Sequence, residues 1–141
     1  MIVDVSVFVD ALFVYDEGRS RLAFEFLKAL DEKGHDILEP EVFGIELISQ
    51  LVRRRPREVS KKIYDEIMQR VIIVDDIEYD TLFEIALTTG CRAIDAYYIA
   101  VAYEVSDVLV SSDKVMVDNA RKHGVEAYYL PAEFEKVMKK L

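Results

Sequence analysis

The sequence predicts an α/β fold in which a parallel central sheet is flanked by helices on both faces. The expected arrangement has three layers and is Rossmann-like. Short runs rich in Val, Ile and Leu alternate along the chain with longer segments of helical spacing. Such apolar runs are typical of strands that helices cover on both faces. The chain lacks repeats, low-complexity tracts and linkers, so residues 1–141 are expected to form a single domain.

Five strands are expected, each preceding a helical segment. The first begins at Ile2, and its apolar run continues to Val9, although an earlier end near Val5 would leave VFVDALF to begin a helix. The other four strands are expected at residues 37–38, 71–74, 108–110 and 127–130.

Helical spacing marks the segments between these strands. RSRLAFEFLKALDEKG has one apolar face and ends at Gly34, a residue type that stops helices. VFGIELISQLVRRR and PREVSKKIYDEIMQR meet at Pro56, which predicts a helical hairpin. DTLFEIALTTG ends at Gly90 and is followed by AIDAYYIAVAYEV, which predicts a second hairpin. KVMVDNARKHG and PAEFEKVMKKL complete the expected helices.

Composition limits the class of protein. A single cysteine, Cys91, excludes an internal disulfide framework and favours a reducing compartment. No apolar run approaches the roughly 18 residues that a membrane span needs, so a cytoplasmic protein is expected. The net charge of −9 argues against nucleic-acid binding driven by bulk charge, but a nuclease that holds a metal ion with carboxylates remains compatible with it.

Asp4 is an aspartate in an otherwise apolar run, MIVDVSVFVD. Burial of an uncompensated charge costs several kcal/mol, so such a residue usually has a partner. If the strand ends here, Asp4 and Ser6 lie at its carboxyl end, where parallel α/β proteins form their sites. The alternative is that one of them caps the following helix.

Two further acidic residues lie on expected helices. Glu46 shares a narrow polar stripe with Ser49, Gln50 and Arg53, and the alternative to a functional role is a solvated glutamate. Asp95 is the only charged residue between Ala93 and Tyr103, in a helix that is apolar nearly all round. The helix dipole and a pairing with Arg92 would make its burial tolerable without explaining its presence.

Asp113 closes the strand-like run DVLVSSD, after Ser111 and Ser112. An N-cap for the next helix and a ligand at the strand end are both compatible with this position. Two acidic residues at strand ends and two on neighbouring helices could meet in one crevice. Four carboxylates this close would raise each other's pKa steeply unless a cation neutralised them, and Mg²⁺ or Mn²⁺ prefers such oxygen ligands.

The segments VDVSVFVD, GIELISQL, RAIDAYYIAVA and VLVSSDKVM, in this order and over the whole chain, resemble the PIN-domain ribonucleases, in particular the VapC-like toxins of toxin–antitoxin pairs. The resemblance implies an acidic metal site and two supporting hydroxyls. The implied metal ligands and catalytic residues are Asp4, Glu46, Asp95 and Asp113, and the implied supporting hydroxyls belong to Ser6 and Ser111. Some members of that family carry a further acidic residue a few positions after the last aspartate, which is Asp113 here. In this chain Lys114, Val115 and Met116 occupy those positions, and Asp118 lies one helical turn further on.

Under this resemblance the chain is expected to be a metal-dependent endoribonuclease that hydrolyses RNA phosphodiester bonds, with Mg²⁺ or Mn²⁺ as cofactor. An antitoxin partner and a homodimer are expected with it. A cluster of arginines at the tip of the first hairpin could contact RNA phosphates or satisfy the dipole of its own helix. These residues are Arg53, Arg54, Arg55 and Arg57. Nearby phenylalanines, Phe13 and Phe24 among them, are expected in the core or at a dimer face.

Three other interpretations account for part of this pattern. A receiver-like signalling domain would use Asp75 or Asp76 at the end of a central strand, but it would leave Asp95 and Glu46 without a purpose. A phosphohydrolase of the haloacid dehalogenase type requires an aspartate where Ser6 stands. A PIN-fold binding scaffold without nuclease activity is the alternative that the sequence leaves open.

Overall fold

The computed structural model describes residues 1–141 and contains eight helices and five strands. The chain alternates strands with single helices or helix pairs, as the hydrophobic pattern predicts. In order, the elements are β1 (Ile2–Val3), α1 (Val5–Leu12), α2 (Glu17–Glu32), β2 (Ile37–Pro40), α3 (Val42–Val52), α4 (Arg57–Met68), β3 (Val71–Val74), α5 (Tyr79–Thr89), α6 (Ala93–Val105), β4 (Leu109–Ser111), α7 (Lys114–Lys122), β5 (Ala127–Tyr129) and α8 (Leu130–Met138).

All strand pairs are parallel. β1 pairs with β4 and β4 pairs with β5, while β2 pairs with β3. The two groups meet between β1 and β2, where the Leu38 N–H donates to the Met1 carbonyl at 3.0 Å and the Val3 N–H donates to the Glu39 side chain at 2.7 Å. The strands therefore lie in the order β3, β2, β1, β4, β5, as a two-stranded and a three-stranded sheet that meet at β2 and β1, with β3 at the edge.

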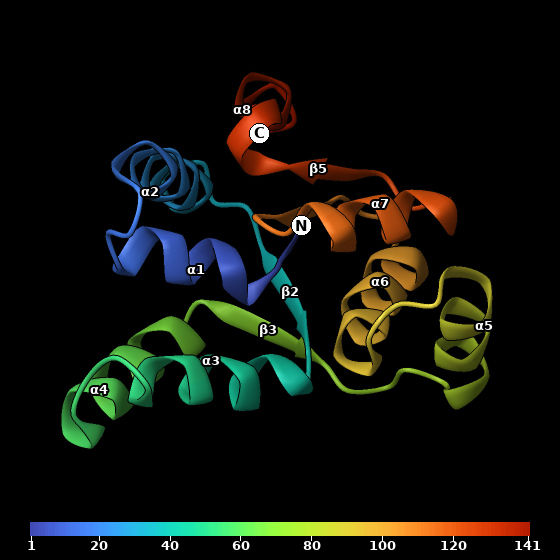
Figure 1. Ribbon diagram of the computed structural model, residues 1–141, viewed down its shortest axis with the longest axis horizontal. Coiled ribbons are helices and arrows are strands. Elements are labelled where there is room, and N and C mark those ends of the chain that lie inside the picture. The colour runs from blue at the N-terminus through green and yellow to red at the C-terminus, as the bar shows by residue number, and fades with distance from the viewer.

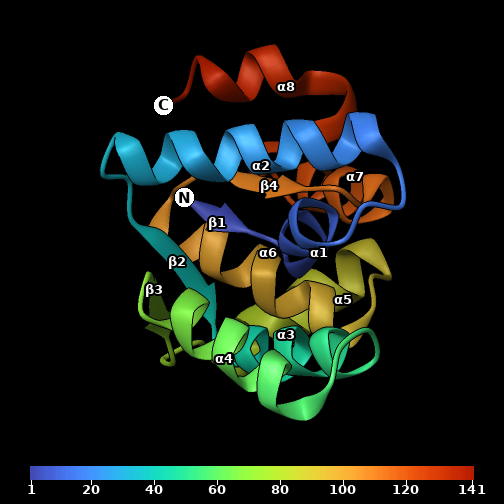
Figure 2. The ribbon, with the colours of Figure 1, turned by 90° about the vertical axis from the view of Figure 1, so that its left-hand side faces the viewer.

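Helices cover both faces of this sheet, which confirms the predicted three-layer α/β class. Figure 1 shows α1 to α4 on one side of the strands and α5, α6 and α7 on the other. The view from the left-hand side places α8 next to α2, and these two helices are in contact (Figure 2). No helix is long and apolar enough to cross a membrane.

The core is one cluster of buried apolar side chains between these layers. α6 contributes most of one helix to it, since its residues from Tyr98 to Ala102 are all buried. This confirms the prediction of a helix enclosed nearly all round. Its C-terminal end turns at Ser106, which adopts a left-handed conformation with φ 54°.

Several element boundaries differ from those predicted. The first strand ends at Val3 rather than continuing to Val9, because the backbone after Asp4 turns into α1. β2 extends past Leu38 to Pro40, so that Glu39 lies within the sheet. The last strand ends at Tyr129, and Leu130 already belongs to α8. Apolar residues at strand ends and first helical turns look alike in sequence, which explains these shifts.

Candidate acidic site

Asp4 lies where β1 ends and α1 begins, and its carboxylate faces the neighbouring strand rather than the helix. It occupies the N-cap position of α1 but makes no side-chain capping bond, so the capping alternative is wrong for this residue. Its Oδ2 accepts hydrogen bonds from the hydroxyl of Ser111 at 2.7 Å and from the hydroxyl of Ser6. Its backbone N–H donates to the Val110 carbonyl at 3.0 Å. Strand pairing and two hydroxyls thus fix a buried carboxylate.

The two serine hydroxyls also tie the strand ends together. The Ser6 Oγ accepts from the Ser112 N–H at 3.0 Å, and the Ser111 Oγ accepts from the Asp113 N–H at 2.9 Å. Each hydroxyl therefore donates to Asp4 and accepts from the loop that follows β4. This loop cannot move far without loosening the Asp4 carboxylate.

Asp113 begins α7 and performs two roles at once. Its Oδ1 caps the helix by accepting from the Val115 N–H at 2.8 Å, while its Oδ2 accepts from Arg92 at 3.1 Å. Capping and participation in the site therefore coexist, as the strand-end position allows.

Asp95 lies in the first turn of α6 and is buried, and Arg92 pairs with it as predicted. The Arg92 Nε and Nη2 donate to the two Asp95 carboxylate oxygens at 2.9 and 3.0 Å. The same guanidinium reaches Asp113, so it bridges the two aspartates. These bonds hold the pKa of Arg92 above its ordinary value. Arg92 itself stays 67% exposed at the rim of the site.

Glu46 projects from the middle of α3 and is half-buried. The hydroxyl of Tyr98 on α6 donates to its Oε2 at 2.6 Å. Burial raises the pKa of Glu46 to about 6, although the bond from Tyr98 acts in the opposite direction. A solvated glutamate would have neither feature, so that alternative is wrong.

These side chains surround one polar crevice of about 210 Å³. Its lining residues come from α1, α3 and the segments before α6 and α7. They are Asp4, Val5, Ser6, Val9, Asp10, Glu46, Gln50, Arg92 and Asp113. Asp95 joins this group through Arg92. The structure thus places three of the four predicted acidic residues around this crevice and the fourth, Asp95, behind Arg92.

Electrostatics at the crevice favour a cation. Burial raises the pKa of Asp4, and the two serine hydroxyls offset part of that increase. The negative charge of Asp95 raises the pKa of Asp4 further, and the charges of Asp4 and Asp95 act on Glu46 in the same direction. A cation at this position would lower the pKa of both Asp4 and Glu46, because it favours their charged forms.

The donor atoms suit a hard divalent ion, since the acidic side chains and hydroxyls offer oxygen alone. In the present side-chain arrangement, no group of three or more His, Cys, Asp or Glu side chains lies close enough together to hold a metal ion. The Arg92 guanidinium stands between Asp95 and Asp113, where it supplies the positive charge. The residues therefore fit a metal by chemistry, and the four-carboxylate ligand set stays a prediction.

The remaining candidates lie outside the crevice. Arg54 and Arg55 contact aromatic rings beside α1, whereas Arg53 and Arg57 are exposed and make no side-chain hydrogen bond or ion pair. Asp118 pairs with Lys114 on the surface of α7 at 2.7 Å and does not line the crevice.

Sequence reasoning missed several polar residues near the site. In the sequence, Tyr98 looks like the other apolar and aromatic residues of its helix. Asp10, which lines the crevice, pairs with Arg19 of α2 at 3.0 Å, and this pair was not predicted. Glu39 is fully buried on β2, and its Oε2 has no hydrogen-bond partner. Its signal was available, because ILEP encloses a charged residue between apolar neighbours in the same way as IVDV encloses Asp4.

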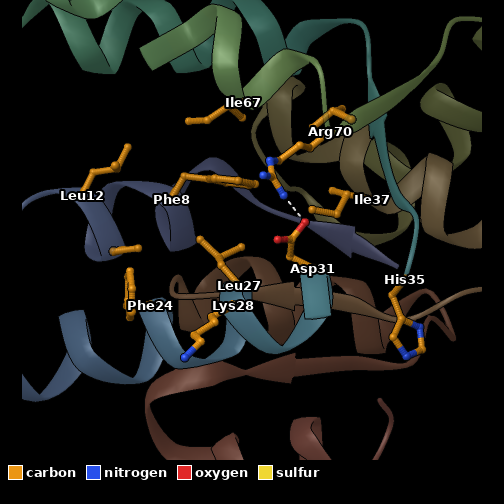
Figure 3. A pocket seen from close by; sticks show the side chains of 12 residues that line it. Phe8, Leu12, Phe24, Leu27, Lys28, Asp31, His35, Ile37, Ile67 and Arg70 are labelled. Carbon is orange, nitrogen blue, oxygen red and sulfur yellow. Dashed lines mark hydrogen bonds and ion pairs between the residues drawn. The ribbon is translucent and has the colours of Figure 1, made fainter. Parts of the chain in front are cut away.

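A cavity of about 510 Å³ is separate from the acidic crevice. Figure 3 shows its apolar side chains, which come from α1, α2, α4 and the strands β2 and β3, together with the ion pair between Asp31 and Arg70. None of the four acidic site residues lines it. Phe24, at its edge, is 60% exposed, so this phenylalanine is not part of the core.

A parallel sheet with an acidic crevice at its strand ends defines an α/β protein of the class whose sites form beyond the carboxyl ends of the strands. Comparison with known families agrees with this class: the PIN domain model matches residues 1–122. The chain belongs to the PIN-domain family, whose members are generally nucleases that use divalent metal ions.

Solved structures share the fold. PAE2754 from Pyrobaculum aerophilum superposes with a TM-score of 0.67 at 17% identity, covering 98% of this chain and 96% of that one. FitAcB from Neisseria gonorrhoeae superposes with a TM-score of 0.65 at 17% identity, covering 90% of this chain and 95% of that one. No curated protein sequence matches the chain.

Proposed function

We propose that the chain is a divalent-metal-dependent endoribonuclease that hydrolyses RNA phosphodiester bonds, and that it acts as the VapC-like toxin of a toxin–antitoxin pair. The observation that carries this proposal is the buried Asp4 carboxylate, which two serine hydroxyls hold at the end of β1 while its pKa is raised. Such a costly arrangement has a purpose if a cation and a charged substrate meet there.

The residues that would hold Mg²⁺ or Mn²⁺ are Asp4, Glu46, Asp95 and Asp113. When bound, the ion acidifies water for attack on the phosphodiester and stabilises charge on the departing oxygen. Ser6 and Ser111 fix the position of Asp4, as a second shell fixes a ligand.

Two other side chains orient the remaining groups. Tyr98 holds Glu46 in one orientation through its hydroxyl. Arg92 lies at the rim with most of its surface exposed, where its guanidinium can bind a substrate phosphate in place of a carboxylate. The site needs no histidine, and the crevice contains none.

The test is cleavage of a mixed pool of single-stranded and structured RNAs with Mn²⁺ or Mg²⁺. EDTA and Asp95→Asn are both expected to abolish cutting, whereas Asp65→Asn, which alters an exposed carboxylate paired with Lys61 on α4, should cut like the wild type. Undiminished cutting by Asp95→Asn would contradict the assigned site. Calorimetric Mn²⁺ binding without any cleavage would favour the binding scaffold instead.

The receiver-like alternative loses support from the sheet order. β3 lies at the edge of the sheet, so Asp75 and Asp76 do not follow a central strand as that interpretation requires. Asp75 lines a different pocket from the acidic crevice. The family match favours the PIN interpretation over it.

Protein partners form the second part of the proposal. The resemblance to VapC-like toxins implies a homodimer and an antitoxin whose tail covers the active groove. Exposed apolar side chains such as Phe24 and Leu12, beside the cavity of Figure 3, favour protein contacts on that face. Light scattering across micromolar concentrations should give twice the chain mass of 16.3 kDa, and a monomeric mass throughout would contradict the dimer.

A further inference from the structure

A group of aromatic and arginine side chains lies where the loop after α1 meets the end of α3. We call Phe13, Tyr15, Arg54 and Arg55 the aromatic platform. The Arg54 guanidinium carbon lies 5.4 Å from the centre of the Phe13 ring and 5.7 Å from that of Tyr15. The Arg55 guanidinium carbon lies 4.8 Å from the Phe13 ring centre. Phe13 is buried, so it anchors the two arginines from below.

The aromatic platform connects directly to the acidic crevice. Gln50, which lines the crevice, accepts two hydrogen bonds from the Arg54 Nη1, at 2.8 Å to its carbonyl and 2.7 Å to its side chain. Glu46, Gln50 and Arg54 are spaced four residues apart, which places them in a row along one side of α3 and its end. At about 1.5 Å per residue this row is about 12 Å long, so the platform lies close to the crevice.

Tyr15 presents a ring that the fold does not use for packing. It is 73% exposed, although its hydroxyl accepts a bond from the Arg54 Nε at 3.0 Å. Arg54 thereby has its Nε and Nη1 fixed by neighbours, while its Nη2 has no partner. An exposed ring of fixed orientation beside a held guanidinium with a free N–H group is suited to stacking a base and contacting a phosphate.

We propose that Tyr15 stacks an unpaired nucleobase of an RNA whose scissile phosphate lies in the acidic crevice, and that Arg54 contacts a phosphate next to that base. This inference rests on the proposed nuclease function, and it adds two side chains that would position the RNA beside the site. Bases within a duplex are already stacked on both faces, so the platform selects single-stranded segments. Stacking does not depend on net charge, so in a chain of charge −9 it would add to the contacts that arginines make with phosphates.

The structure thereby divides the arginine cluster. Arg54 is held at the platform by Gln50 and Tyr15 and has the phosphate-contacting role. Arg55 packs on the Phe13 ring. Arg53 and Arg57 have no such contacts, and their replacement by alanine should change RNA affinity less than Arg54→Ala.

The chain contains no tryptophan, so one introduced tryptophan reports from a single position. Tyr15→Trp is made in the Asp95→Asn background, which keeps the RNA intact. A short unstructured RNA is titrated in the presence of Mn²⁺, and the same RNA annealed to its complement serves as the duplex. The matched control is Tyr79→Trp in the same background, because Tyr79 is 74% exposed and lines a pocket other than the acidic crevice.

Saturable quenching of the Tyr15→Trp fluorescence by single-stranded RNA is expected, with much weaker quenching by the duplex and none in the Tyr79→Trp control. Equal quenching by both RNAs, or in both variants, would overturn the inference. A second measurement uses anisotropy of labelled RNA. Tyr15→Leu should weaken binding by about fivefold to a hundredfold, the range for one stacked base. Tyr15→Phe keeps the ring and loses only the bond from the Arg54 Nε, so it should weaken binding less than Tyr15→Leu.

The two proposals fail in different ways. Cleavage of RNA by the wild type at a KM that Tyr15→Leu leaves unchanged would overturn the stacking role and leave the nuclease intact. Quenching and tight binding without cleavage would support the stacking role and contradict the nuclease. If Tyr15 is instead a protein contact, no RNA changes its signal, and the stacking role is overturned.

Discussion

The Glu39→Gln substitution tests how a fully buried carboxyl on β2 affects the stability of the fold. The Glu39 Oε1 accepts the Val3 N–H at 2.7 Å, which joins β2 to the central strand, and its Oε2 has no partner. Burial raises the pKa of Glu39 well above its usual range, and the Val3 bond offsets part of this. Glutamine keeps the acceptor oxygen and removes the titration.

The magnitude follows from proton linkage. The ordinary pKa of this side chain is 4.5, and the folded value is higher, so the folded chain binds the proton more tightly than the unfolded chain. Stability from this residue is therefore fully present below pH 4.5 and is lost as the pH rises towards the folded pKa. While the folded carboxyl stays protonated, the loss is about 1.4 kcal/mol per pH unit, or at most about 2.5 kcal/mol between pH 5 and 7.

The assay is urea unfolding of the wild type and Glu39→Gln at pH 5, 6 and 7. The free energy of unfolding of the variant, relative to the wild type, should rise with pH by up to the amount just given. The extra amide N–H can lower its stability at pH 5, so the trend with pH is the decisive quantity. Glu41→Gln, at an exposed position one residue after β2, should show no such trend. A difference between Glu39→Gln and wild type that is constant from pH 5 to 7 would refute the reasoning.

Three further predictions concern the crevice. Ser111→Ala should weaken Mn²⁺ binding by about tenfold or more, because it removes a hydroxyl that holds the Asp4 carboxylate, and losing such a bond to a metal ligand has effects of that size. Ser112→Ala removes a hydroxyl without a hydrogen-bond partner and should leave Mn²⁺ binding unchanged. Calorimetric titration measures both affinities. Mn²⁺ affinity should fall below pH 6, because the pKa of Glu46 is raised to about 6 and a protonated carboxyl cannot ligate; a pH series of the same titrations checks this. Arg92→Gln leaves Asp95 buried without its ion pair, so the variant should melt at a lower temperature than the wild type in EDTA. Added Mn²⁺ should raise the melting temperature of the variant more than that of the wild type, and a thermal scan measures both changes.

Each of these expectations has a contradicting result. Equal Mn²⁺ affinity in the two serine variants would remove the supporting role of Ser111. Affinity that stays constant from pH 5 to 7 would show that Glu46 does not take part in binding. If Mn²⁺ raises the melting temperature of Arg92→Gln and of the wild type equally, the metal does not replace the positive charge of Arg92 beside Asp95.

Much of the fold was predictable because its signals are local. The apolar run before Asp4 and the enclosed α6 helix have patterns that only buried elements show. Charged residues that interrupt such patterns, Asp95 above all, indicated the crevice. Strand ends were predicted less well, since the difference between β1 continuing and α1 beginning at Val5 depends on pairing with β4, more than one hundred residues away in sequence.

The contacts that orient the site could not be predicted in the same way. The pairing of Tyr98 with Glu46 joins α6 to α3, and nothing in either segment specifies the other. The bridge that Arg92 makes to Asp113 likewise depends on how the fold brings together the residues just before α6 and α7. Arg92 with Asp95 was predictable, because three residues along one helix set their distance.

The order of the strands determines when the crevice can exist during synthesis. β1 is made first, yet its neighbour β4 and the Ser111 hydroxyl that holds Asp4 are encoded near the other end of the chain. A nascent chain that has not reached residue 111 therefore lacks the partner strand, one of the two serine hydroxyls on Asp4 and the Asp113 carboxylate. The acidic residues can therefore converge only after Asp113 has been synthesised, so a translation product that stops before this residue carries no assembled site.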